Sequence, residues 1–115
     1  MEIRAIYPEE HEEALKLIWD TFLEFEAPDY SKQGVATFLN FISDVTIFEV
    51  VEFFVASENN ELKGVIATRN NRSHVCCFFV SAKFQRQGIG GKLWEYLKNN
   101  SDSLVITVNS SPFAV

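Results

Sequence analysis

The sequence has few of the residues that build metal sites and disulfides. Its 115 residues include two cysteines and two histidines. His11 and His74 have no Cys or His partner at the spacing of a metal motif, so we expect no metal site. Cys76 and Cys77 are adjacent, and neighbouring residues of a strand point to opposite faces. We therefore expect two free thiols, as in the reducing environment of the cytoplasm.

Positive charge and long apolar runs are also scarce. The chain has ten Lys and Arg residues and sixteen Asp and Glu residues, which gives a net charge of -6. Nucleic-acid binding usually needs a basic surface, so we expect no nucleic-acid partner. The apolar runs are far shorter than the roughly 20 residues of a membrane span. The charged beginning, "MEIRAIYPEEHEE", does not resemble a signal peptide. We expect no membrane partner.

The remaining composition is that of an ordinary globular protein. Hydrophobic residues make up 47% and charged residues 23% of the chain. This length suits one domain with a substantial core, which we place at 1–115.

Hydrophobic periodicity predicts an alternation of strands and helices. An alternating strand at 2–6 precedes a helix that begins near Pro8, and Ser31 has the position of an N-cap for a second helix. Residues 44–52 fit either a helix end or a strand start. Three strands follow, then a helix whose apolar residues recur every four positions, and a final strand. The expected fold class is α/β with mixed layers. The later elements are expected at 52–57, 62–69, 74–80, 89–97 and 103–109.

The segment "FFVSAKFQRQGIGGKLWEYL", residues 78–97, contains a glycine loop between a strand and a helix. Two familiar phosphate motifs do not fit it. Leu93 stands where a P-loop needs a hydroxyl and where a dinucleotide fingerprint needs its third glycine. Glycines at a helix N-terminus nevertheless let an anion approach the free backbone amides. Lys83, Arg86 and Lys92 add positive charge nearby. The alternative is a turn that only starts the helix.

At this loop the sequence resembles a known family. "QRQGIG" matches the Gln/Arg-x-x-Gly-x-Gly/Ala signature of the GCN5-related N-acetyltransferases (GNAT). The flanking "GVIATRNNRSHVCCFFV" is similar to the family's strand pair before the loop, and "ITVNSSPFAV" to its strand after the loop helix. The resemblance implies the acyl-CoA N-acyltransferase fold, a central mixed sheet flanked by helices, for most of the chain.

The resemblance also implies acetyl-coenzyme A as cosubstrate, with no metal. Its pyrophosphate is expected on the loop amides, and its pantetheine arm along the end of the preceding strand. The residues expected to bind it are Phe78, Phe79, Val80, Gln85, Arg86, Gln87, Gly88, Ile89, Gly90, Gly91, Lys92 and Asn109.

The implied reaction needs a base and an oxyanion donor. His74 is a candidate base, and strand alternation places it on the same face as Cys76, Phe78 and Val80. Its alternative role is packing at a strand end. The backbone amide of Val80 is the expected oxyanion donor. Glu24, Glu26 and Asp29, between the first two helices, are candidates to bind the amine, or else form a solvated acidic turn.

The sequence departs from the family near residue 115. The family's C-terminal helix and last strands, with the tyrosine that often acts as general acid, have no counterpart here. We expect 104–109 to be an exposed edge strand, through which two copies could form a homodimer. The expected function is acetyl transfer to a primary amine of a small molecule or peptide. The alternatives are a non-catalytic or regulatory CoA-binding module, or a fragment of a longer acetyltransferase.

Overall fold

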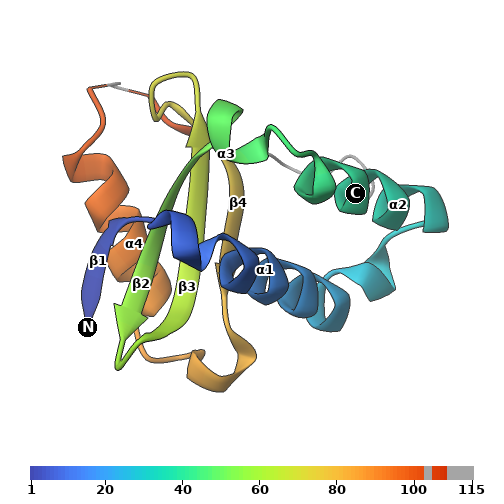
Figure 1. Ribbon diagram of the computed structural model, residues 1–115, viewed down its shortest axis with the longest axis horizontal. Coiled ribbons are helices and arrows are strands. Elements are labelled where there is room, and N and C mark those ends of the chain that lie inside the picture. The colour runs from blue at the N-terminus through green and yellow to red at the C-terminus, as the bar shows by residue number, and fades with distance from the viewer. Residues whose placement is uncertain (103–104, 109–115) are drawn as a thin grey trace.

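The computed structural model describes residues 1–102 and 105–108. It contains a five-stranded sheet, of which Figure 1 labels the first four strands. The first four strands form antiparallel neighbours in chain order, and the fifth lies parallel to the fourth. The predicted central mixed sheet is therefore confirmed. The strands are β1 (Glu2–Ala5), β2 (Glu52–Glu58), β3 (Glu61–Arg69), β4 (His74–Val80) and β5 (Thr107–Val108).

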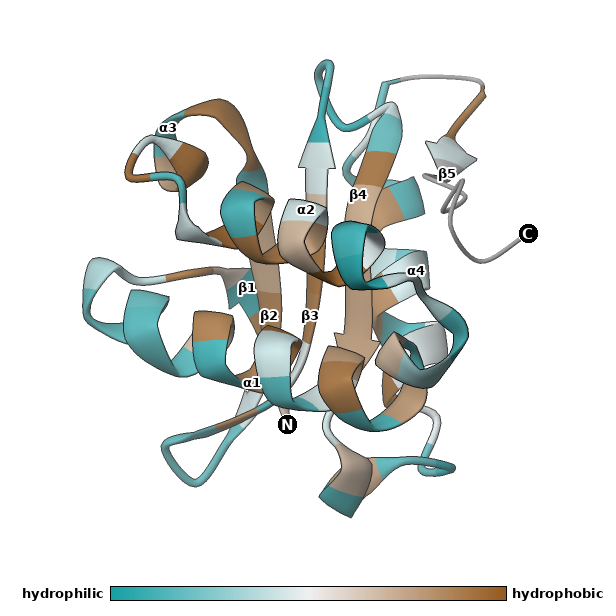
Figure 2. Ribbon diagram, turned by 90° about the vertical axis from the view of Figure 1, so that its right-hand side faces the viewer, coloured by the Kyte–Doolittle hydropathy of each residue, from teal (hydrophilic) through white to brown (hydrophobic). Residues whose placement is uncertain are grey.

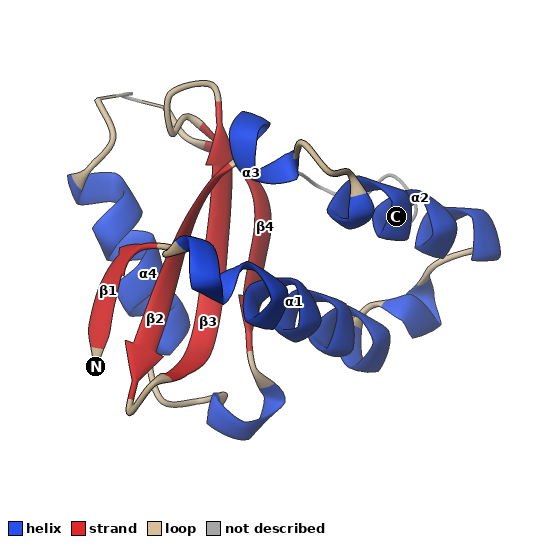
Figure 3. Cartoon of the chain, viewed as in Figure 1, coloured by secondary structure: helices blue, strands red, loops and turns tan. Residues whose placement is uncertain are grey.

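Helices cover both faces of this sheet (Figures 1 and 3). One face packs against α1 (His11–Phe25) and, beside it, α2 (Lys32–Ser43), and the other packs against α4 (Ile89–Asn99) (Figure 2). Ser31 caps α2 as predicted, because its hydroxyl accepts a hydrogen bond from the Gly34 amide at 3.0 Å. The ambiguous segment 44–52 contains both a short helix, α3 (Ile47–Val50), and the first residue of β2.

The core is divided by the sheet into two layers, and Figure 2 shows largely hydrophobic strands covered by helices that alternate hydrophilic and hydrophobic residues. The α1-side layer includes Ile18, Phe22 and Phe79, all buried. The α4-side layer contains Ile89, Leu93 and Leu97, the stripe predicted from their four-residue spacing. No helix in the described part of the chain is both long and apolar enough to cross a membrane.

Helix α4 lies very close to β3 at Gly64. A Cβ atom on Gly64 would lie 3.0 Å from Leu93 Cδ1, 3.2 Å from Ile89 Cγ2 and 3.3 Å from the Phe79 carbonyl oxygen. Only glycine gives the helix room at this point. The contact fixes the start of α4, and with it the glycine loop, against the sheet.

A β-bulge interrupts the pairing of β3 with β4. Ala67 pairs with Cys77 but Thr68 pairs with Val75, which leaves Cys76 as the extra residue. Cys76 and Cys77 consequently both belong to the α1-side core. Our expectation that they point to opposite faces was wrong, whereas both thiols are free and buried as expected.

The bulge also changes the face assigned to His74. Val75 lies in the α4-side core, so His74 turns to the α1 side, as Cys76 does. Val80 packs against the α4-side core, and Phe78 stacks with Trp94 of α4. The expectation that His74 shares a face with Phe78 and Val80 was therefore wrong, because strict alternation ends at the bulge.

Candidate functional site

The glycine loop combines two left-handed residues with the start of a helix. Arg86 has a φ of 64° and Gly88 a φ of 79°, and α4 begins at Ile89. The Lys92 amide donates to the Gly88 carbonyl at 3.1 Å. The amides before Lys92 therefore precede the helix's own hydrogen-bond ladder, and such amides form a natural anion site with the helix dipole.

Small side chains keep these amides accessible. A Cβ atom built on Gly91 would have no heavy atom within 4 Å, and one on Gly90 would lie 3.7 Å from both Phe78 and Val80. Methyl groups therefore fit at both positions, but a larger side chain would fill the space in front of the loop. The glycines leave that space open for a bulky ligand.

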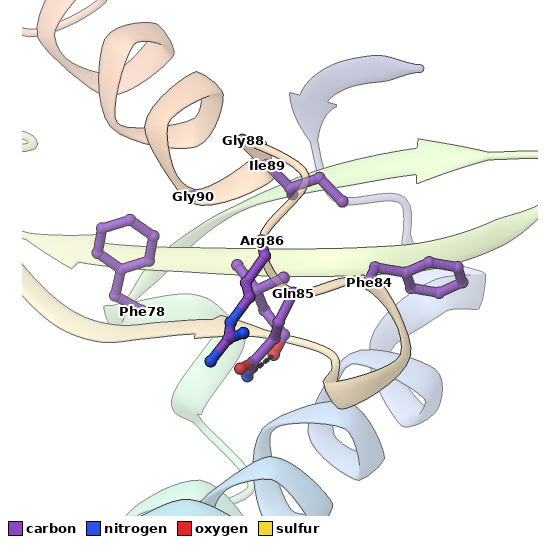
Figure 4. A pocket seen from close by; sticks show the side chains of 8 residues that line it. Phe78, Phe84, Gln85, Arg86, Gly88, Ile89 and Gly90 are labelled. Atoms are coloured by element: carbon purple, nitrogen blue, oxygen red, sulfur yellow. Dashed lines mark hydrogen bonds between the residues drawn. The ribbon is translucent and has the colours of Figure 1, made fainter.

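An open hollow of about 420 Å³ lies between this loop and the end of β4 (Figure 4). Arg86 projects over it and has no ion pair with any residue that the structure describes. The floor is apolar and the loop side is polar, which suits a ligand with an anionic group and an uncharged arm. The lining residues are Phe78, Val80, Phe84, Gln85, Arg86, Gly88, Ile89 and Gly90.

Gln85 connects the loop to the end of β4. Its side-chain amide donates to the Val80 carbonyl at 3.1 Å, across the hollow's floor (Figure 4). This hydrogen bond holds the loop over the strand end, so Gln85 positions the hollow as well as lining it.

The hydrogen-bond ladder determines which backbone groups of β4 remain available. The Ser81 amide donates to the Lys63 carbonyl of the strand opposite, at 2.9 Å. Bonded and non-bonded pairs alternate along an antiparallel ladder. In this register Phe79 therefore directs its amide and carbonyl to β3, while Phe78 and Val80 direct theirs to the other edge.

That other edge of β4 is open beside the hollow. Within the described residues β5 pairs with β4 only at His74 and Val75. The edge from Phe78 to Val80 has no described strand beside it, and an extended ligand has backbone partners there. Phe79 was expected to bind the pantetheine arm. Its backbone instead faces β3, and its ring lies 6.0 Å from the ring of Phe38 in the core.

Not every expected residue lines this hollow. Gly91 and Lys92 line a second hollow with Ile3 of β1, on another side of the loop. Lys83 lies 3.8 Å from Glu61, its ion-pair partner. Gln87 belongs to the loop but lines neither hollow. Asn109 and the first residue of the predicted edge strand 104–109 lie outside the described residues, whereas 105–108 are described and include β5.

His74 lies at the opposite end of β4 from the loop. Its Nδ1 is 2.6 Å from the Thr107 hydroxyl, which is 3.3 Å from the Ser73 carbonyl. The carbonyl can only accept, so the consistent assignment has Thr107 donating to Ser73 and Nδ1–H donating to Thr107. Nε2 is then the unprotonated nitrogen, the form that a general base requires.

Among the three acidic candidates, Glu26 has the most distinctive environment. All three side chains are exposed, but of the three only Glu26 has a carboxyl whose pKa is raised, by partial burial. Burial also raises the pKa of the Cys77 thiol, with Cys76 and Glu26 acting in the same direction. The Glu26 carboxylate therefore lies within electrostatic reach of the β4 bulge.

Sequence reasoning missed Arg69, which lies beside the same bulge. Its Nε donates to the Cys76 sulfur at 2.9 Å. The bulge that creates this contact has no signature in the continuously apolar strand, so periodicity gave no sign of it.

Comparison with known proteins gives one family and one fold. Residues 26–115 match the model of the acetyltransferase (GNAT) domain. No curated protein matches the sequence. A GCN5-related N-acetyltransferase from Rhodopseudomonas palustris is 18% identical, with a TM-score of 0.80 over 98% of this chain and 74% of its own. The PaiA N-acetyltransferase from Thermoplasma acidophilum, solved with coenzyme A, is 16% identical, with a TM-score of 0.71 over 85% and 69%.

Proposed function

The chain belongs to the GNAT acetyltransferase family, and on that basis we propose that it transfers the acetyl group of acetyl-coenzyme A directly to a primary amine of a small molecule or peptide. The observation that carries the proposal is the continuity of two features. The anion site at the start of α4 opens directly into the hollow beside the unpaired edge of β4. An anionic ligand with a long polar arm fits both at once.

In this proposal the loop amides from Gln87 to Gly91 bind the pyrophosphate, and Arg86 neutralises its charge. The pantetheine arm lies along the open edge and donates a hydrogen bond to the Phe78 carbonyl there, while the Val80 carbonyl already accepts from Gln85. The PaiA relative, solved in complex with coenzyme A, supports this ligand for the fold.

The reaction then needs one proton acceptor and one oxyanion donor. His74 Nε2 is the candidate acceptor of a proton from the attacking ammonium, through a chain of waters, because six residues, about 20 Å along the strand, separate it from Val80. The amine nitrogen forms a bond to the acetyl carbon, the carbon–sulfur bond breaks, and the thiolate of coenzyme A leaves and takes up a proton. The amides of Val80 and Phe78 both face the open edge and are the candidates to stabilise the oxyanion.

The setting of the reaction is also a proposal. Two buried free cysteines suit a reducing compartment, so we propose a cytoplasmic location. We propose that two copies associate through the β5 edge, and light scattering at several protein concentrations tests this. A single monomeric mass at every concentration would contradict it.

The direct test is the release of free thiol from acetyl-coenzyme A with a panel of primary amines. We expect release that depends on an acceptor amine, with an acetylated product in the mass spectrum. Coenzyme binding without thiol release for any amine would instead indicate a non-catalytic binding module. If the protein neither binds acetyl-coenzyme A nor releases thiol from it, the proposed ligand itself is wrong.

A further inference from the structure

Arg69 is held beside the bulge of β4 with most of its guanidinium unused. Its Nε bonds the Cys76 sulfur at 2.9 Å, and its Cζ lies 5.8 Å from the centre of the Phe41 ring. The contact with Cys76 orients one edge of the planar guanidinium, and the contact with Phe41 orients one of its faces. Neither engages the two terminal nitrogens, which form the fork that binds carboxylates in bidentate fashion.

Arg69 is exposed and has no carboxylate partner among the described residues. Six of the ten Lys and Arg residues form ion pairs within the described residues. The exceptions there are Arg86 and Lys92 at the glycine loop, Lys32 at the start of α2, and Arg69. Arg69 is thus an arginine on the α1 side that is oriented by its neighbours but carries no counter-ion.

A negative group lies near the same bulge without neutralising Arg69. The Glu26 carboxylate is within electrostatic reach of Cys77, the residue after Cys76. No ion pair joins Glu26 to Arg69, so their charged groups are more than 4.0 Å apart. Charges of opposite sign, Arg69 of β3 and Glu26 at the end of α1, therefore both act electrostatically on Cys77 at the bulge.

The bulge is also where the open edge of β4 ends. Between the bulge and the start of β4, β5 pairs with β4 at Val75 and His74. A pantetheine arm that starts at the glycine loop and follows the open edge of β4 therefore points toward Cys76 and Cys77. His74, the proposed base, lies two residues before Cys76, about 7 Å along the strand and on the same side of the sheet.

We propose that the acceptor is an amino acid or a closely related small zwitterion, whose carboxylate is bound by Arg69 while Glu26 attracts its ammonium group. This inference rests on the proposed acetyl transfer and names its substrate class. An amine that carries its own carboxylate supplies the counter-ion that Arg69 lacks. It also brings an ammonium group to the site between Glu26 and His74. A simple diamine or polyamine would instead place a second positive charge beside Arg69.

The test compares each of the common amino acids with its carboxamide as acetyl acceptor. The two members of each pair differ only in the carboxylate. The wild-type protein should favour the best amino acid over its carboxamide by about 10- to 100-fold in kcat/KM, the range of a charged hydrogen-bond pair. R69Q should reduce that ratio to about one. R69K should retain part of the preference.

K16Q is the matched control, because it removes the same charge from an exposed position of α1. It should leave the ratio unchanged. Equal use of amino acids and carboxamides by the wild-type protein would overturn the inference, as would an unchanged ratio in R69Q. Thiol release with simple amines but not amino acids would overturn it while leaving the proposed function intact.

A binding measurement separates the inference from the proposed function. In the presence of coenzyme A, NMR titration should detect binding of the preferred amino acid by the wild-type protein and its loss in R69Q. If no amine supports thiol release but this binding is found, acetyl transfer is wrong and the carboxylate site stands. If no amino acid binds, the inference itself is wrong.

Discussion

His74 and Thr107 lie 2.6 Å apart, ring nitrogen to hydroxyl, at the point where β5 pairs with β4. The contact joins the strand that carries the proposed base to its parallel neighbour. With the hydroxyl donating onward to Ser73, the imidazole is held with Nε2 available. Thr107 is therefore a positioning residue for the proposed base, which sequence analysis did not identify.

Replacing His74 by alanine should lower kcat by about 100-fold or more, the contribution of a general base. The affinity for acetyl-coenzyme A should not change, because the loop and open edge are intact. Steady-state kinetics and calorimetry on the same sample measure the two effects. H11A is the control, since His11 stacks on Phe48 at 3.5 Å, away from β4. Wild-type turnover in H74A would return His74 to a packing role.

Replacing Gly64 by alanine should destabilise the fold by about 1–3 kcal/mol, as overpacking does. The new methyl group meets Leu93, Ile89 and the Phe79 carbonyl within 3.3 Å, and the carbonyl cannot move aside cheaply. Urea unfolding measures the change. In G91A, the control, the methyl group meets nothing within 4 Å, so its free energy of unfolding should stay the same or rise by up to about 1 kcal/mol. Equal stability of G64A and the wild type would show that α4 can shift freely.

The stability of the first turn should depend on pH through Glu10. The Arg4 guanidinium bonds both oxygens of this carboxyl at 2.8 and 2.9 Å and holds its pKa below the usual range, helped by the Tyr7 amide. A lowered pKa contributes stability above the unfolded-state value, about 4.3, and this is lost as pH falls through the folded-state value.

Accordingly, E10Q should cost about 1.5–3 kcal/mol at pH 7, the range for hydrogen bonds to charged groups, and the difference from the wild type should shrink at acidic pH, below about 4.3. Urea unfolding at both pH values measures it. E9Q removes an exposed neighbouring charge and should have little effect. A difference between E10Q and the wild type that is the same at both pH values would show that the loss is one of packing.

Sequence patterns predicted the elements better than the details of β4. Four-residue spacing identified the stripe of α4, and Ser31 identified the start of α2, because each depends on local chemistry. The bulge at Cys76 was not predictable, since "HVCCFFV" is apolar throughout and carries no alternation to interrupt. Missing it misassigned the faces of His74 and Cys77 and concealed Arg69. The use of Phe79 by β3 follows from register, which the sequence does not specify.

The loop residues, by contrast, were accessible to sequence reasoning. Gly88 has a left-handed backbone, which favours glycine, and a Cβ atom on Gly91 would meet no heavy atom within 4 Å, while one on Gly90 would make ordinary contacts at 3.7 Å. The sequence pattern did not predict the directions in which the loop's side chains point. It gave no indication that Lys92 turns to the second hollow while Arg86 projects over the first.

The most direct test of the account is calorimetric titration of acetyl-coenzyme A into the wild-type protein, G90A and G90E. A methyl group at position 90 would lie 3.7 Å from Phe78 and Val80, an ordinary contact, whereas a glutamate would place a negative side chain in the proposed phosphate site. We predict binding to the wild-type protein and to G90A, and none to a folded G90E. Equal affinity in all three would contradict the placement of the coenzyme at the start of α4.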